Sequence, residues 1–96
     1  MCTMIQLTTP VTGGGKGARG WFPVTQASVG YDHTTYLRQE HALLLDFLNP
    51  GLGPTARVAV ELDIASGKAL VAKLQAAIAA AEQSGFPEHA PTPVPA

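Results

Sequence analysis

The chain has 96 residues, enough for one small domain that buries only about 60–65% of the surface its unfolded chain exposes. Six Lys and Arg residues against seven Asp and Glu residues give a formal net charge of -1, which argues against a nucleic-acid binder and a polybasic membrane anchor. A single Cys excludes an internal disulfide, and no unbroken apolar run approaches the roughly 20 residues that span a bilayer. The first twenty residues lack the pattern of a signal peptide. We therefore expect a soluble, cytoplasmic protein with neither nucleic acid nor a membrane as partner.

Four segments favour strands because their apolar residues recur with a period of two or form a short continuous run. These segments are residues 2–8, 24–33, 41–48 and 56–62. The third is apolar at nearly every position, which suits a central strand covered on both faces. Residues 9–20 hold five glycines and are predicted as a connecting loop, and residues 49–54 as a turn.

After residue 62 the apolar residues recur with the spacing of a helix. The stripe consists of Leu70, Leu74, Ala77, Ile78 and Ala81. Asp63 can act as the N-cap, and Gly85 followed by Pro87 is a helix stop. Gly67 inside this helix costs about 1 kcal/mol relative to Ala. Either the helix starts later, with Ser66 as its cap, or another group packs closely at Gly67.

The resulting order is β-β-β-β-α, and the expected fold class is α+β. Sequential strands are usually neighbours, so we predict a four-stranded antiparallel meander sheet packed by one C-terminal helix. Residues 1–85 form this single domain. Residues 86–96 contain four of the eight prolines and are predicted as a disordered tail.

The meander allows the strand register to be predicted. Pairing Leu45 with Val58 places Asp46 opposite Arg57, a favourable cross-strand charge pair. In the preceding hairpin, pairing Leu45 with Val29 places His33 directly opposite His41, with Cβ atoms about 4.5–5.5 Å apart.

The same meander gathers side chains capable of chemistry at one rim of the sheet. They are Cys2, His33, Glu40, His41, Glu61 and Asp63. A thiolate (Cys2) and two imidazoles (His33 and His41) suit a transition metal such as Zn, Cu, Fe or Ni. Glu40 is a candidate fourth ligand or catalytic base on a metal-bound water, and Asp32 a candidate partner that orients an imidazole. The alternative is structural, with the histidines bonded to backbone or water and Cys2 acting as a small hydrophobe.

The glycine-rich segment contains a second candidate site. Gly15, Gly17 and Gly20 satisfy G-x-G-x-x-G, but a strand-like sequence follows, whereas a dinucleotide motif opens a helix. Gly17 after Lys16 likewise excludes a P-loop. What remains is a loop whose amides, with Lys16 and Arg19, hold a carboxylate or phosphate. The alternative is a mobile hairpin connection with solubilising charges.

One helix covers only one face of the predicted sheet. The second face would show small and largely apolar residues, namely Ser28, Gly30, Ala42, Leu44 and Ala59. Contiguous exposed apolar patches usually mark an interaction surface. We therefore expect a homo-oligomer or a larger protein partner.

Several short elements of the sequence resemble an uncharacterised family of short bacterial proteins. They are Met1-Cys2-Thr3, Gly15-Lys16-Gly17-Ala18-Arg19-Gly20-Trp21-Phe22, Asp32-His33, Glu40-His41 and Asp46-Phe47-Leu48-Asn49-Pro50. The likeness covers roughly the first eighty residues. It implies a soluble bacterial domain and carries no activity and no catalytic residues with it.

Two classes of function follow from these observations. In the first, the protein is a small metal-binding protein, or a metal-dependent enzyme acting on a small molecule at the rim. In the second, it is a non-catalytic accessory subunit or binding module that docks onto a larger enzyme through its apolar sheet face.

Overall fold

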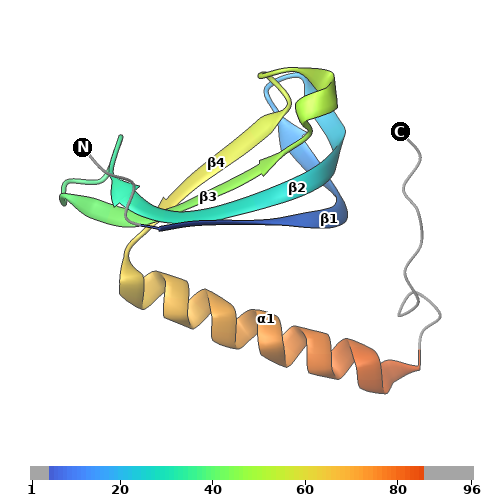
Figure 1. Cartoon of the computed structure of the whole chain (residues 1–96). Coiled ribbons are helices and arrows are strands. Elements are labelled where there is room, and N and C mark those ends of the chain that lie inside the picture. The colour runs from blue at the N-terminus through green and yellow to red at the C-terminus, as the bar shows by residue number, and fades with distance from the viewer. Residues whose placement is uncertain (1–4, 86–96) are drawn as a thin grey trace.

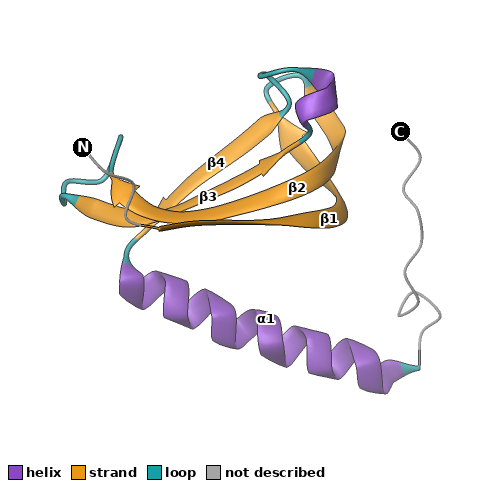
Figure 2. Cartoon of the chain, viewed as in Figure 1, coloured by secondary structure: helices purple, strands orange, loops and turns teal. Residues whose placement is uncertain are grey.

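Four strands and one long helix follow one another in a computed structural model that describes residues 5–85 (Figure 1). The elements are β1 (Ile5–Gly17), β2 (Gly20–His33), β3 (His41–Leu48), the 3-10 helix η1 (Pro50–Leu52), β4 (Arg57–Leu62) and α1 (Ile64–Ser84). The strands form one antiparallel sheet in the order β1-β2-β3-β4. This arrangement confirms the predicted α+β class (Figure 2). Cys2 and the predicted tail at residues 86–96 lie outside the described residues.

The first hairpin is much longer than predicted. β1 runs on through the glycine-rich segment to Gly17, and a two-residue turn leads directly into β2. The predicted loop at residues 9–20 is therefore wrong. Glycines without side chains leave room for the side chains of β2, since a Cβ at Gly15 would lie 2.9 Å from Val24 Cγ2 and 3.4 Å from Phe22 Cζ. These contacts stabilise an extended chain that glycine alone would not favour.

The β1–β2 hairpin is also bent. Its register shifts between Pro10 and Gly13, which is a β-bulge in β1. Gly20 completes the turn with a positive φ of 108°, a conformation that favours glycine. Bulges bend strands, and the far end of this hairpin curls over until Gly17 approaches the Arg57 carbonyl oxygen at the start of β4 (Figure 1).

The predicted register between β3 and β4 is wrong by two residues. Leu45 faces Val60 instead of Val58, because the connection around η1 is centred one residue further along the chain. A shift of two leaves every side chain on its predicted face. The Asp46–Arg57 ion pair therefore still forms, as a diagonal contact in which Arg57 Nε lies 2.7 Å from Asp46 Oδ1.

Asn49 fixes the connection between β3 and β4. Its Oδ1 accepts a hydrogen bond from the Gly51 N–H at 3.1 Å, and its Nδ2 donates to the Pro23 carbonyl oxygen of β2 at 2.9 Å. The backbone N–H of Asn49 donates to the Ala56 carbonyl oxygen at 3.0 Å. One side chain thus ties this connection to the inner strand β2.

Helix α1 follows β4 after the single residue Asp63. Asp63 is the N-cap, and its Oδ1 accepts a hydrogen bond from the Ser66 N–H at 2.8 Å. Of the two helix starts considered, the earlier one is therefore correct. Gly85 ends the helix in the left-handed conformation, with φ 78°.

Gly67 is the point where α1 touches the sheet. It is the one buried residue of the helix, and a Cβ at this position would overlap Leu43 Cδ1 of β3. Beyond this contact α1 diverges from the sheet (Figure 1). The unfavourable glycine in the helix is thus explained by a close approach to Leu43.

The interior of the described part of the chain is small. Its buried apolar residues are Val24, Ala27, Ala42 and Ala56. No large side chain within residues 5–85 is fully buried. Most large aliphatic side chains of the sheet and of α1 therefore keep a substantial part of their surface in contact with solvent.

Candidate functional site

The two histidines of the rim are cross-strand neighbours, as predicted. His33 at the end of β2 pairs with His41 at the start of β3, and their ring centroids lie 4.7 Å apart with an interplanar angle of 35°. Tyr31 stacks on His41 with a centroid distance of 5.7 Å. Alternate residues of a strand point to opposite faces, so both rings lie on the same sheet face as Leu43, the face toward α1.

The other predicted rim residues do not join this pair within the described chain. Asp32 points to the opposite face by strand alternation, and its Oδ1 accepts from the backbone N–H of His33 at 2.7 Å. Glu40 is exposed in the connection before β3. Cys2 lies outside the described residues. Within residues 5–85, no group of three or more His, Cys, Asp or Glu side chains is placed to hold a metal ion.

Glu61 has a structural role that the sequence did not indicate. Its carboxylate accepts hydrogen bonds from three consecutive backbone N–H groups of the connection between β2 and β3. The distances are 2.6 Å from Thr35, 3.0 Å from Tyr36 and 3.0 Å from Leu37. These bonds to the charged form hold the pKa of Glu61 below its ordinary value. Glu61 therefore fixes the position of the connection that borders the histidine pair.

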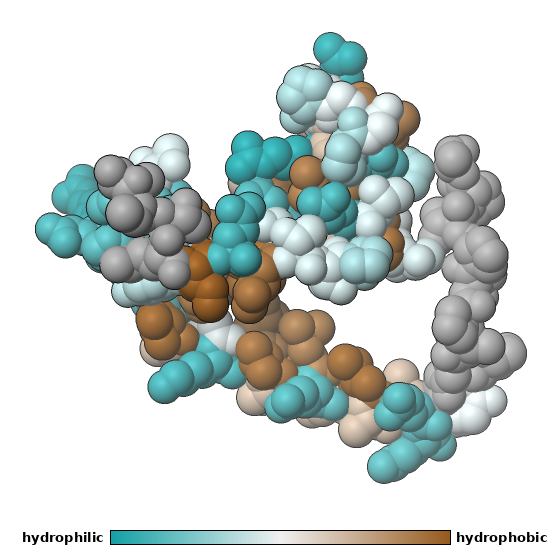
Figure 3. Space-filling view, in the orientation of Figure 1, coloured by the Kyte–Doolittle hydropathy of each residue, from teal (hydrophilic) through white to brown (hydrophobic). Residues whose placement is uncertain are grey.

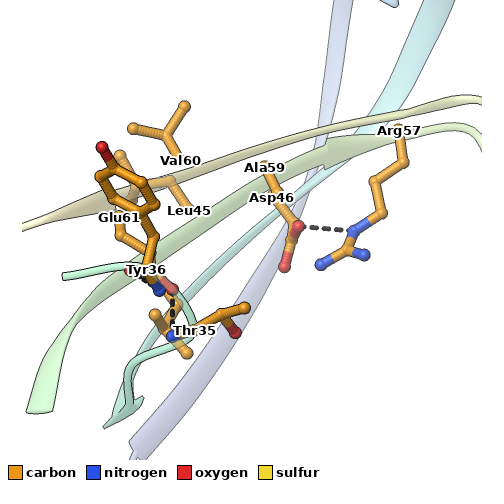
Figure 4. A pocket seen from close by; sticks show the side chains of 9 residues that line it. Thr35, Tyr36, Leu45, Asp46, Arg57, Ala59, Val60 and Glu61 are labelled. Carbon is orange, nitrogen blue, oxygen red and sulfur yellow. Dashed lines mark hydrogen bonds and ion pairs between the residues drawn. The ribbon is translucent and has the colours of Figure 1, made fainter. Parts of the chain in front are cut away.

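A polar hollow of about 450 Å³ lies on the sheet face away from α1, beside this connection (Figure 4). Arg57 reaches across to Asp46 in its wall, and this ion pair holds the pKa of Arg57 above its ordinary value. The third charge in the wall, Glu61, is bound to backbone amides. All three charges of the hollow thus have partners within the chain, an arrangement that stabilises the fold. This is the face that we predicted as an apolar docking surface.

A larger hollow lies on the other side, between the sheet and α1. This groove, which we call the α1 groove, has a volume of about 640 Å³. Its lining is Val29, Leu43, Leu45, Phe47, Leu62, Ile64, Gly67, Lys68, Leu70, Val71 and Leu74. Lys68 is the one charged residue of this lining. The space-filling view shows the same apolar surface passing from the sheet onto the helix (Figure 3).

The sequence pattern does not reveal the α1 groove, because an amphipathic stripe on a helix predicts close packing of that helix on the sheet. The apolar stripe of α1 does face the sheet, but the helix diverges, so the two apolar surfaces do not cover each other. Leu74 remains 52% exposed and Phe47 38% exposed. One feature of the sequence does indicate incomplete packing. Large apolar residues are scarce on β1, and its glycines have no side chains with which to fill a core.

Lys16 and Arg19 do not sit in an open loop. Residues 13–17 pair with β2, Lys16 lies opposite Trp21, and Arg19 lies in the two-residue turn. Both cations are exposed. The predicted anion site at this position therefore lacks the open loop on which it depended.

Helix α1, with 21 residues, is long and apolar enough to cross a membrane by length and composition. It is the one helix of this kind within residues 5–85. A search for unbroken apolar runs overlooks it because Lys68 and Lys73 interrupt the pattern. Core helices packed inside proteins show the same length and composition, but α1 is largely exposed in the described part of the chain. Lys73 lies near the middle of α1. Inserting a lysine at the centre of a membrane-spanning helix costs about 2.5–3.5 kcal/mol of free energy.

These features define the class of the protein as a small α+β domain with an open apolar groove between its sheet and its helix. The chain belongs to DUF6295, a family of unknown function whose pattern matches residues 1–87. The predicted resemblance to an uncharacterised family is confirmed at this level. Comparisons with curated proteins and with solved structures gave no match.

Proposed function

We propose that this protein is a non-catalytic binding module that docks onto a protein partner through the α1 groove. The observation that carries this proposal is the groove itself, whose lining of aliphatic and aromatic side chains faces solvent. Exposed contiguous apolar surface of this extent marks an interaction site. The groove contains Lys68 as its single charged group and lacks the paired acid and base that catalysis would need.

Two alternatives to protein docking are weaker. The polar hollow has its charges paired within the chain, which leaves no free pair of groups there for acid–base chemistry. Insertion of α1 in a membrane places Lys73 near the bilayer centre. A cytoplasmic, accessory role beside a larger protein is therefore part of the same proposal.

Site-specific photo-crosslinking in the producing cell tests the docking function. A photoreactive phenylalanine analogue replaces Leu74, which lines the groove, or Ala76, which lies on the opposite side of α1. Because only position 74 faces the groove, we expect one discrete covalent adduct from it, at least about five times more abundant than from position 76. Equal or absent adducts at the two positions would contradict the docking function.

Metal binding is a second candidate function, favoured by the 4.7 Å separation of the His33 and His41 rings. Two imidazoles this close can coordinate one transition-metal ion. An ion held by two imidazoles keeps open positions for water, and metal-bound water would supply the hydrolytic chemistry.

Titration calorimetry of untagged protein with Zn²⁺, Cu²⁺ and Ni²⁺ tests this second function. We expect one ion per chain and at least about tenfold weaker binding in the His33→Ala/His41→Ala variant, because each imidazole contributes a metal bond. His89→Ala, which removes the third histidine of the chain, is the matched control and should leave the affinity unchanged. Wild-type protein that binds no ion, or a double variant that binds as well, would exclude the rim as a metal site.

A further inference from the structure

We infer that the α1 groove receives helix α1 of a second copy of this chain, so that two copies close both grooves around a two-fold axis. This inference rests on the proposed docking function and names its partner. Three observations carry it: the incomplete interior of each chain, the size of the apolar surface, and the placement of charges along α1.

Each chain holds about half of a hydrophobic core. The sheet and α1 both present large apolar side chains toward the groove, yet the buried apolar residues of the described chain are one Val and three Ala. A second copy supplies a helix of the same apolar character. In a symmetric dimer the same surface patch serves on both subunits, so one set of residues completes both interiors.

The exposed surface is of the size that a dimer needs. Seven large apolar side chains on the groove and its continuation along α1 are each between 38% and 55% exposed. They are Val29, Phe47, Ile64, Leu70, Val71, Leu74 and Ile78. Their exposed parts amount to on the order of 600 Å², since side chains of this size carry somewhat less than the roughly 150–250 Å² of an aromatic residue. Stable interfaces bury about 800 Å² per partner. The half-buried residues of the lining add further exposed area, so the total approaches this value.

The apolar stripe of α1 extends past the part that lines the groove. Leu70 and Leu74 line it, and Ile78 continues the same stripe one turn further along the helix. This continuation is free to enter the groove of the second copy. A second helix that lies beside α1, where α1 diverges from the sheet, would cover the apolar surfaces that the close approach at Gly67 leaves open.

The charges on α1 favour an antiparallel arrangement of the two helices. Lys68 and Glu82 lie on the same side of α1 and are separated by about 21 Å along its axis. Among residues 5–85 the one ion pair is Asp46–Arg57, so neither Lys68 nor Glu82 has an ionic partner there. Two antiparallel helices centred near Gln75 place Lys68 of each copy beside Glu82 of the other. A parallel arrangement would instead bring like charges together.

Analytical ultracentrifugation of the full chain across the micromolar range tests the inference. We expect a dimer, at least about 30-fold weaker association for Leu74→Glu, and no change for Ala76→Glu on the opposite side of α1. Far-ultraviolet circular dichroism checks that each variant retains its helix. A variant that associates as tightly as wild type despite Leu74→Glu would overturn the inference.

A charge exchange provides a second test that does not disturb the apolar surface. Lys68→Glu should weaken the dimer, and Lys68→Glu/Glu82→Lys should restore it, because the pair is reversed on both sides of the axis. A double variant that stays as weak as the single one would overturn the antiparallel arrangement.

The crosslinked adduct at position 74 separates the two proposals. A mass of twice the chain supports the second copy. If the wild-type protein is monomeric and its adduct has the summed mass of this chain and a different protein, this inference is overturned and the docking function stands. A monomer that forms no adduct overturns both proposals, and a monomer that sediments with lipid vesicles only when Leu74 is present overturns the second copy in favour of a lipid surface.

Discussion

Gly67→Leu is expected to destabilise the fold, although it replaces a glycine inside a helix. The new side chain would collide with Leu43 of β3, where α1 lies close to the sheet. Overpacking of this kind costs about 1–3 kcal/mol, whereas removing the glycine gains about 1 kcal/mol in helix propensity. We expect a net loss of up to about 2 kcal/mol in the free energy of unfolding, measured by urea denaturation.

Two further variants isolate the contact at Gly67. Ala69→Leu, on the exposed side of the same helix, should change the free energy of unfolding by no more than about 0.5 kcal/mol. Adding Leu43→Ala to Gly67→Leu should make room for the new side chain, so that the double variant is more stable than the sum of the single effects by at least about 1 kcal/mol. Strictly additive losses would mean that α1 does not rest on Leu43.

Protonation of Glu61 is expected to release the connection between β2 and β3. The pKa of Glu61 is lowered by hydrogen bonds from the backbone N–H groups of Leu37, Thr35 and Tyr36. A carboxyl whose pKa is lower in the folded state contributes stability that is complete above its unfolded pKa and is lost as the pH falls through the folded value. The protection of the amides of residues 35–37 against hydrogen exchange, measured by NMR relative to the intrinsic rate at each pH, should therefore fall below about pH 4.5.

Substitutions distinguish this effect from general acid unfolding. Glu61→Gln should lower the protection of residues 35–37 already at neutral pH and remove the loss of protection in acid, because the side-chain amide accepts these bonds more weakly than a carboxylate. The matched control is Glu40→Gln, which removes an exposed carboxylate in the same connection. It should leave the protection of residues 35–37 unchanged. The pKa of Asp63 is also lowered, by the Ser66 hydrogen bonds, and its protonation should appear instead at the Ser66 amide. Slow exchange at residues 35–37 in Glu61→Gln would show that the carboxylate does not hold them.

The sequence predicted the parts of the fold that depend on local alternation. The His41–Leu48 strand has the predicted bounds, and its pairing with β2 follows the predicted register because a shift of one would turn apolar residues toward solvent. Asp63 as cap and Gly85 as stop were likewise readable from residue type. The juxtaposition of His33 and His41 follows from the same register.

Other features depend on contacts between segments far apart in the chain. A pattern of neighbouring residues does not indicate such contacts. The glycine run is extended because Phe22 and Val24 pack over it, which composition alone does not indicate. The β3–β4 register differs because Asn49 fixes the turn by bonds that reach β2. The divergence of α1, and with it the groove, depends on the angle at which the helix leaves Asp63, for which residue pattern carries no signal.

The bent edge strand β1 has a consequence for how copies of this chain can meet. A long, open strand edge is a template on which further chains can add by main-chain pairing, which leads to fibres and aggregates. Here Pro10 lacks an N–H to offer, the bulge beside it breaks the regular row of donors, and Lys16 places a charge near the hairpin tip. Uncontrolled polymerisation along the strand edge is thereby disfavoured, and contact through side chains remains open.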